Sequence, residues 1–201
     1  MFMTRQFIVT AVLTMLSLTI QAQTKQKEHQ VFASVGLLVN RDNGVTETGL
    51  SARIGYGLNC YLSDKVSVMP AIALRQAAAY PFTSKDGEDT DGFLFLDVPI
   101  ALQYHFSGVG NGWSVSFGPV FSYCLDNDRY YIDASPDDPR NDMDKIRNFD
   151  FALQPGVHYR VGRFRLGVES RVGVFNIKNT NAIVTGTKRL YDVVASVYYR
   201  F

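Results

Sequence analysis

The sequence predicts an all-β protein, an eight-stranded antiparallel up-and-down transmembrane β-barrel with short periplasmic turns and long extracellular loops. From Val31 onward, apolar and polar side chains alternate with a period of two, which is typical of strands that separate two environments. The connections between these segments alternate between short and long, and aromatic residues gather at both ends of the apolar faces. The mean hydropathy of −0.04 excludes a bundle of membrane-spanning helices but not a barrel, in which alternating residues average out.

The first 22 residues are predicted to be a secretory signal peptide. The cation Arg5 precedes an apolar stretch from Phe7 to Ile20, and a small-residue cleavage site follows it. The alternative is a membrane-anchor helix, which needs about 20 mainly apolar residues, whereas threonine and serine dilute this stretch. We therefore expect residues 23–30 to form a short periplasmic segment and residues 31–201 to form the barrel.

The first three strands are predicted over residues 31–40, 50–62 and 66–80. Most alternate residues in each segment are apolar, and Arg53 and Arg75 mark the opposite faces of the second and third. The alternation is least regular in the first and third segments, so their boundaries stay open.

The next three strands are predicted over residues 94–106, 113–125 and 149–161. Leucine, valine and aromatic residues alternate there with serine, glycine and charged residues. Pro99 and Pro119 interrupt two of these segments, because proline cannot donate a hydrogen bond to a neighbouring strand.

The last two strands, over residues 164–174 and 190–201, show the cleanest alternation. Asp192 and Arg200 fall on one face of the final segment, opposite valine and tyrosine residues. A helix would distribute these residues around its circumference, so the pattern favours a strand.

Short and long connections alternate along the chain. The short connections are 63–65, 107–112 and 162–163, and the longer ones are 41–48, 83–92, 126–148 and 178–189. Short turns on one rim and long polar loops on the other are the layout of an outer-membrane barrel, and an even number of strands leaves both termini on the periplasmic side.

The apolar face is predicted to contact lipid and the polar face to line the lumen. A lipocalin-like soluble barrel would show the same alternation with the faces reversed, but two aromatic girdles and a final strand ending on Phe201 favour the membrane barrel. The predicted inward charges are Arg53, Arg75, Asp97, Asp150, Arg160, Arg165, Glu169, Arg171, Asp192 and Arg200. Because eight strands enclose just enough room for side chains, we expect these charges to pair and to close the lumen.

Four segments resemble motifs of the PorT-like outer-membrane β-barrel proteins of Bacteroidota. They are FLFLDVPIALQYHF at 93–106, WSVSFGPVFSYCL at 113–125, FDFALQPGVHYRVGRFRLGVESRVGVFNI at 149–177 and VVASVYYRF at 193–201. The resemblance spans the mature chain, is firmest from Phe93 onward, and accounts for the two strand prolines. It implies an outer-membrane component, and some members of that family are associated with secretion or gliding machinery.

Two histidines are the strongest candidates for a chemical site. His105 and His158 are predicted to face the lumen near the periplasmic rim, where Arg160 and Asp97 would complete an acid–base cluster. No serine nucleophile in a recognisable context and no metal-ligand spacing accompanies them, so we expect hydrogen-bonded lumen histidines. His29, in the predicted N-terminal segment, has no role. The sequence predicts no catalytic, cofactor-binding or metal-binding residue.

Two cysteines, Cys60 and Cys124, are placed on opposite faces and at opposite ends of their strands. This placement favours free thiols over a disulfide, and neither residue lies in a metal-ligand spacing.

The outer loops carry charge that suits surface contacts. Segments 83–92 and 126–148 are rich in aspartate, and Asp89-Thr90-Asp91-Gly92 is a fragment of a calcium loop that lacks the later bidentate glutamate. We expect solvated loops, with divalent-cation contact as the alternative. Segment 178–189 carries Lys178, Lys188 and Arg189 without an acid, which suits lipid phosphates.

The predicted function is that of a non-enzymatic structural or interaction component in the outer membrane of a Gram-negative bacterium. The expected partners are outer-membrane lipid and lipopolysaccharide, the barrel assembly machinery through the strand ending in Phe201, and a protein at the extracellular loops. The formal net charge of +1 lacks the basic excess of a nucleic-acid-binding protein. The alternatives are an enzyme that modifies lipid A or lipopolysaccharide and a small-solute channel.

Overall fold

A computed structural model describes residues 26–42, 45–80, 90–108, 110–130, 147–177 and 188–201. Within these residues, eight strands form a closed barrel in chain order. The strands are β1 (Gln26–Asp42), β2 (Val45–Tyr61), β3 (Val66–Tyr80), β4 (Thr90–His105), β5 (Gly112–Tyr130), β6 (Phe149–Val161), β7 (Phe164–Gly173) and β8 (Lys188–Arg200).

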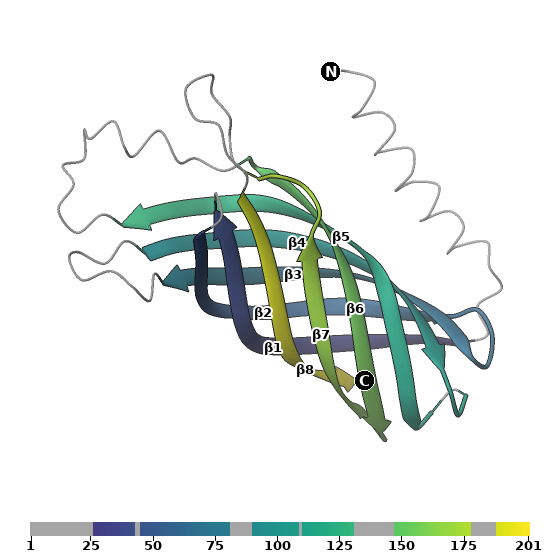
Figure 1. Cartoon of the computed structure of the whole chain (residues 1–201). Helices are drawn as coiled ribbons and strands as arrows, with labels where there is room; N and C mark the ends of the chain where they lie inside the picture. The colour runs from purple at the N-terminus through teal and green to yellow at the C-terminus, as the bar shows by residue number, and fades with distance from the viewer. Residues whose placement is uncertain (1–25, 43–44, 81–89, 109, 131–146, 178–187) are drawn as a thin grey trace, which may run out of the picture.

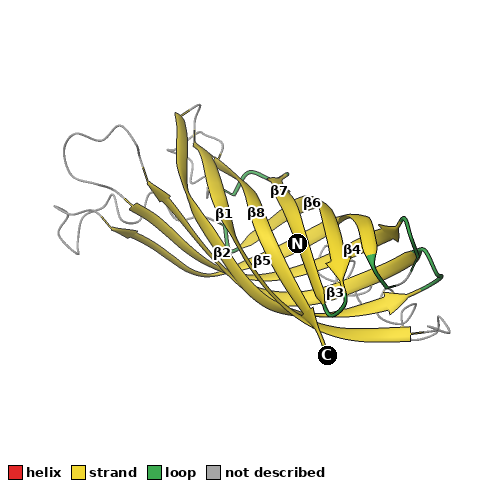
Figure 2. Cartoon of the chain, turned by 90° about the horizontal axis from the view of Figure 1, so that it is seen from below, coloured by secondary structure: helices red, strands yellow, loops and turns green. Residues whose placement is uncertain are grey.

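Every strand pairs antiparallel with its chain neighbours, and β1 pairs with β8 to close the wall. Opposite residues such as Val35 and Ala195 mark this last seam. The closed ring is visible in Figure 1 and, from below, in Figure 2. The predicted fold class, an antiparallel up-and-down barrel, is therefore confirmed.

The two faces of the wall differ as the alternation predicts. Leu37 is 64% exposed on the outer surface, whereas its neighbour Leu38 is 0% exposed in the lumen. The outer surface is dominated by exposed valine, leucine, isoleucine and aromatic side chains. Such a surface is stable only against an apolar surrounding such as the lipid tails of a bilayer.

The aromatic girdle at the periplasmic rim is also present. Exposed rings pair at 4.9 Å between the centroids of Trp113 and Tyr159 and at 5.3 Å between those of Phe164 and Tyr199. At the other rim, Tyr123 and Phe149 face outward from adjacent strands and are exposed. Aromatic rings at these two levels fit the two bilayer interfaces.

Several strands are longer than their alternation predicts, so some predicted bounds are wrong. β1 begins at Gln26 instead of Val31 and therefore includes most of the predicted periplasmic segment. Asp42 lies directly opposite Val45, so most of the predicted loop 41–48 belongs to β1 and β2. The physical reason is that polar residues suit both faces of a strand once it leaves the bilayer, and the apolar signal disappears there.

The same correction applies to two other predicted loops. Thr90 lies opposite Tyr130 and Asp91 opposite Arg129, so the ends of segments 83–92 and 126–148 extend the β4–β5 hairpin. The calcium-loop fragment at 89–92 is therefore largely strand.

The wall has unequal heights at its outer end. Strands β1 to β5 contain 15 to 19 residues each, whereas β6, β7 and β8 contain 13, 10 and 13. Because Tyr123 lies opposite Phe149, the first residue of β6, residues 124–130 of β5 extend beyond that strand. The ends of β3, β4 and β5 project to one side in Figure 1.

The two prolines noted in the sequence lie within strands. The β4–β5 register is interrupted between the pairs Pro99–Val120 and Leu102–Phe117, on either side of Pro119. In this gap a Cβ added at Gly118 would lie 1.9 Å from the carbonyl oxygen of Ile100, so only glycine allows the two strands to approach. The two strands pair again on both sides of this gap, so the missing donors do not separate them, and the same ladder shifts register once more between Leu94 and Phe95.

The predicted signal peptide, residues 1–22, lies outside the described residues. None of the described segments forms a helix long and apolar enough to cross a membrane.

Candidate functional site

The lumen contains a network of paired charges. Arg53 contacts Glu169, and Arg171 contacts Asp150. Arg75 Nε lies 2.7 Å from a carboxylate oxygen of Asp97. The inward direction and the pairing predicted for these six charges are confirmed, whereas Arg165, which was predicted to pair as well, has no carboxylate among its described contacts.

Asp192 is the second carboxylate near Arg75, in the part of the network that is closer to the long loops. Arg75 Nη1 lies 4.0 Å from an Asp192 oxygen, so one guanidinium spans acids on β4 and β8. The planar Arg75 group also lies 4.2 Å from the ring centre of Phe95, an arrangement that stabilises a buried cation.

Glu169 is the centre of the part of the network that is closer to the periplasmic end. Its carboxylate accepts hydrogen bonds from Arg53, from Tyr198 Oη and, at 2.6 Å, from Gln154 Nε2. Four strands, β2, β6, β7 and β8, therefore converge on one carboxylate. Burial of such a charge is tolerated because its oxygens are saturated with donors.

Glu28 forms a second centre at the periplasmic end, which the sequence prediction missed. Arg160 lies 3.0 Å from its carboxylate, Arg200 contacts the other oxygen, and Tyr61 Oη donates to it at 2.9 Å. The predicted strand began at Val31, so Glu28 was left in a periplasmic segment. The alternation of Glu28 and Gln30 with outward Lys27 and His29 is the signal that could have found it.

Arg165 is held without a carboxylate among its described contacts. Its guanidinium lies 3.9 Å from the ring centre of Tyr198, and its Nη1 donates at 2.7 Å to Gln103 Oε1. Stacking on an aromatic ring and an amide acceptor stabilise this cation in the packed lumen.

The two lumen histidines each bond to a serine. His105 Nε2 lies 2.9 Å from Ser67 Oγ, and His158 Nε2 lies 2.9 Å from Ser116 Oγ. Both face inward and are hydrogen-bonded, as predicted, whereas the alternative acid–base cluster with Asp97 does not form, because Asp97 pairs with Arg75 farther along the lumen. The serines were missed since they are distant in sequence and meet the histidines only through strand register.

Ser116, His158 and Glu169 lie in the order of a nucleophile, a base and an acid, with His158 Nδ1 3.9 Å from Glu169. Chemistry at a carbonyl would need substrate access to Ser116 Oγ. Ser116 is 8% exposed and His158 2% exposed, so both are enclosed by the barrel wall and its packed interior. Among the described residues, no group of histidine, cysteine or acidic side chains is arranged to hold a metal ion.

His29 lies on the outer surface, not in a separate periplasmic segment. Its Nδ1 contacts Tyr56 Oη, and its ring stacks on Phe201 at 6.0 Å between centroids. The backbone N–H of Phe201 donates to the His29 carbonyl oxygen at 3.2 Å, which extends the β1–β8 seam. These contacts make His29 part of the periplasmic rim of the barrel wall.

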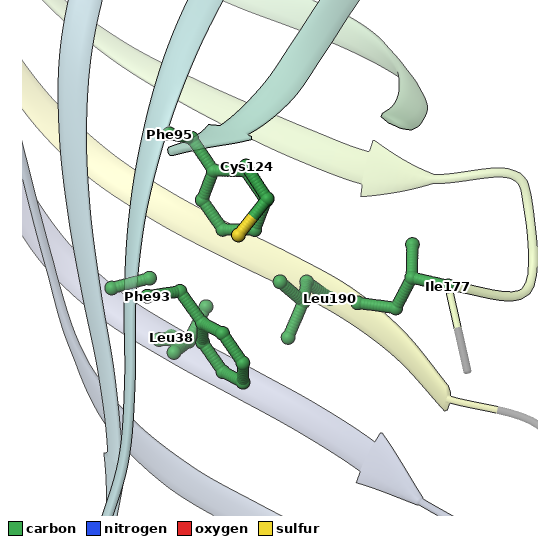
Figure 3. Packing of buried hydrophobic residues seen from close by; sticks show 7 residues of the cluster. Leu38, Phe93, Phe95, Cys124, Ile177 and Leu190 are labelled. Carbon is green, nitrogen blue, oxygen red and sulfur yellow. The ribbon is translucent and has the colours of Figure 1, made fainter. Parts of the chain in front are cut away.

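An apolar layer lies at the outer end of the lumen, and Figure 3 shows it from close by. We call it the outer apolar cluster, and its members are Leu38, Ala77, Phe93, Phe95, Cys124, Ile177 and Leu190. Each is at most 7% exposed. The sequence analysis did not identify this layer, because apolar side chains on the inward face carry no signal distinct from the outward face.

The structure also settles the cysteines and one of the loop cations. Cys60 and Cys124 are both buried free thiols, as predicted. Lys188, predicted as a lipid-phosphate contact, is 3% exposed, and its Nζ lies 5.2 Å from the ring centre of Phe93, so it caps the outer apolar cluster instead. Lys178 lies outside the described residues.

A family model for the outer membrane protein beta-barrel domain matches residues 9–179 of the chain. The chain belongs to this family. Membership locates it in the bacterial outer membrane, in agreement with the apolar outer surface of the barrel. No curated protein sequence matches the chain.

Solved structures of small outer-membrane proteins share the fold. Neisserial surface protein A is 15% identical, with a TM-score of 0.56 over 88% of this chain and 100% of that chain. The outer membrane protein AlkL in lipid bilayers is 17% identical, with a TM-score of 0.51 over 90% of this chain and 93% of that chain. At these identities the likeness concerns the fold alone.

Proposed function

We propose that this family member is a non-enzymatic outer-membrane barrel with a closed lumen, which acts as a structural or interaction component through its outer loops or its periplasmic rim. The observation that carries the proposal is the filling of the lumen by two successive layers. The charge network occupies the periplasmic and central part, and the outer apolar cluster lies beyond it.

A small-solute channel would need a continuous path of water through both layers. Glu28 and Glu169 each bind donors from the two adjacent strands and one arginine from across the lumen, which fixes side chains across the interior. Beyond them, Phe93 and Phe95 pack with ring centroids 6.0 Å apart. Hydrated solutes would have to displace both the ion pairs and the aromatic layer, which opposes diffusion.

A lipid-modifying enzyme would need a reactive group on the lipid-facing surface. His105 and His158 are enclosed, and the outward His29 contacts a tyrosine at the periplasmic end of the wall. Lipid A lies in the opposite leaflet, toward the long loops. The placement of these histidines therefore supports a non-enzymatic role.

The resemblance of four strand segments to PorT-like proteins supports a more specific part of the proposal, a link to secretion or gliding machinery. Recognition of β8 and Phe201 by the barrel assembly machinery is proposed on the same sequence resemblance. The acidic segments around 83–92 and 126–148 and the periplasmic turns are the surfaces proposed to meet a protein partner.

Conductance across planar bilayers tests the closed lumen. Purified protein is expected to give no sustained single-channel currents, and sustained currents of uniform size would contradict the proposal. Incubation with lipopolysaccharide followed by mass spectrometry tests the enzyme alternative, in which a new lipid A mass would overturn the non-enzymatic assignment.

Co-purification from membranes in mild detergent tests the interaction role. Residues 131–146 are replaced by a short glycine-serine linker, which leaves β5 to Tyr130 and β6 from Phe149 unchanged. A matched control shortens residues 81–89. Loss of a partner only in the first variant identifies the longer loop, whereas retention in both variants assigns the contact to the periplasmic rim.

A further inference from the structure

Two arginines lie directly opposite each other on the outer surface of the β1–β8 seam. Arg41 near the end of β1 is aligned with Arg189 near the start of β8, and both side chains are exposed. Directly opposite residues of an antiparallel pair have Cβ atoms about 4.5–5.5 Å apart, and like charges at this separation destabilise the pairing. The seam that closes the barrel therefore contains a repulsive contact.

Nothing among the described side chains offsets this repulsion. No ion pair in the described part of the chain involves either arginine. The next residue on the other side of Arg41 is Thr46 of β2, which is exposed and carries a hydroxyl group. Two guanidinium groups and a hydroxyl thus lie side by side on three adjacent strands, and all of them are hydrogen-bond donors.

The position of this group relative to the apolar band indicates its surroundings. On β1, the outward residues before Arg41 are Val35, Leu37 and Val39, and on β8 Tyr191 and Val193 follow Arg189. The arginines are therefore at the boundary where the lipid-facing surface ends, on the rim of the long loops. In a bilayer this is the level of the headgroups, where arginine side chains extend toward polar groups.

We propose that Arg41 and Arg189, with Thr46, bind a phosphate group of lipid A in the outer leaflet. A phosphate has several acceptor oxygens and a negative charge, so one group accepts bidentate hydrogen bonds from both guanidinium groups and neutralises their repulsion. The neighbouring apolar band accepts the acyl chains of the same molecule. The bound lipid phosphate would in this way stabilise the pairing of β1 with β8. The inference rests on the membrane orientation and not on the proposed role in partner binding.

The test measures binding of lipid A to purified protein in detergent micelles. The probes are lipid A carrying both phosphates, lipid A without phosphates, and inorganic phosphate. We expect the double variant Arg41→Gln/Arg189→Gln to lose at least about tenfold in affinity for phosphorylated lipid A, since charge-assisted bonds are removed. The matched control is Lys65→Gln/Arg163→Gln, which removes the same charge from exposed positions at the periplasmic turns and should bind as the wild type does.

Four results would overturn the proposal. These are equal binding by the arginine double variant, an equal loss in the control variant, equal binding of lipid A without phosphates, and binding of inorganic phosphate as tight as that of lipid A. Equal binding by the arginine double variant would show that the two arginines do not form the site, and an equal loss in the control variant would indicate general charge attraction. Equal binding of lipid A without phosphates would indicate acyl-chain contact alone, and equally tight binding of inorganic phosphate would indicate a site for free phosphate.

A stability measurement separates loss of the site from misfolding. Arg189→Glu replaces the repulsive pair with an attractive one, so we expect this variant to unfold at a higher temperature than the wild type without lipid A. Added lipid A should then stabilise the wild type but not the variant. Stabilisation of both by the same amount would contradict the proposal.

Discussion

The two layers of the lumen are equally buried but are stabilised in different ways. In the charge network each side chain depends on partners from other strands, and Glu169 alone joins residues of β2, β6 and β8. In the outer apolar cluster, Leu38 and Leu190 contact their neighbours without directional bonds, and Phe95 also stacks on Arg75 of the charge network. Removal of one member should therefore leave an uncompensated charge in the first layer and only a cavity in the second.

Breaking the network at its centre should have the largest effect. Glu169→Ala leaves Arg53 buried without its carboxylate and should lower the free energy of unfolding by about 3–5 kcal/mol. Urea unfolding in lipid vesicles measures it, with the fluorescence of Trp113, the single tryptophan of the chain, as the probe. Arg53→Gln, Glu169→Gln and their double variant form a cycle in which the double variant should lose less stability than the sum of the two single losses. A fully additive loss would argue against coupling of the two charges.

Opening the outer apolar cluster should have a slightly smaller effect. Phe95→Ala removes a fully buried ring and should cost about 3 kcal/mol in the same unfolding measurement. Phe95→Leu is the conservative control and should cost less. Phe95→Ala removes the ring beneath Arg75 but leaves the Arg75–Asp97 ion pair in place, so neither variant should conduct in planar bilayers. Currents from Phe95→Ala would make this layer the sole barrier.

A change in spacing within the network should be weaker still. A Cβ added at Gly167 would lie 2.2 Å from His158 Nδ1, so Gly167→Ala forces the imidazole, which also contacts Ser116, to shift. The expected loss is about 1–3 kcal/mol, typical of overpacking. Combination with His158→Ala should reduce the penalty of Gly167→Ala, and an unchanged penalty would show that the clash is relieved elsewhere.

The contact between Tyr56 and His29 lies outside both layers and should have the smallest effect on the free energy of unfolding. Tyr56→Phe removes the hydroxyl that contacts His29 on the outer surface and should cost about 1 kcal/mol, since one hydrogen bond is lost. A loss as large as that of Glu169→Ala would show that the periplasmic rim, and not the lumen, limits the stability of the barrel.

The comparison also explains what the sequence could predict. Charges such as Arg75 and Asp97 identify the lumen face, because a charge is costly on the lipid face. The number of strands, the lumen and lipid faces of each strand and the presence of ion pairs in the lumen could therefore be predicted from the alternation. Phe95 and Leu190 face inward but are apolar, like the residues that face lipid. The outer apolar cluster could therefore not be predicted from the sequence. Glu28 was missed for the converse reason, since polar residues on both faces of β1 looked like a loop.

The contacts between the two lumen histidines and their serine partners could not be predicted from the sequence, because they depend on strand register. Ser67 meets His105, and Ser116 meets His158, through the register of neighbouring strands. A shift of register by one residue would move every side chain to the other face, and register depends on turns and prolines throughout the hairpin. Segment lengths and composition do not contain that information.

The unequal height of the wall gives the barrel a direction in the plane of the membrane. Residues 124–130 of β5 extend about 20 Å along the strand beyond the start of β6, at a rise of about 3.3 Å per residue. A neighbour diffusing in the bilayer meets a tall flank on the side of β3 to β5 and a low flank on the side of β6 to β8 (Figure 1). Lateral encounters with the same molecule are therefore not equivalent, and a rotation about the membrane normal changes which surface a neighbour contacts.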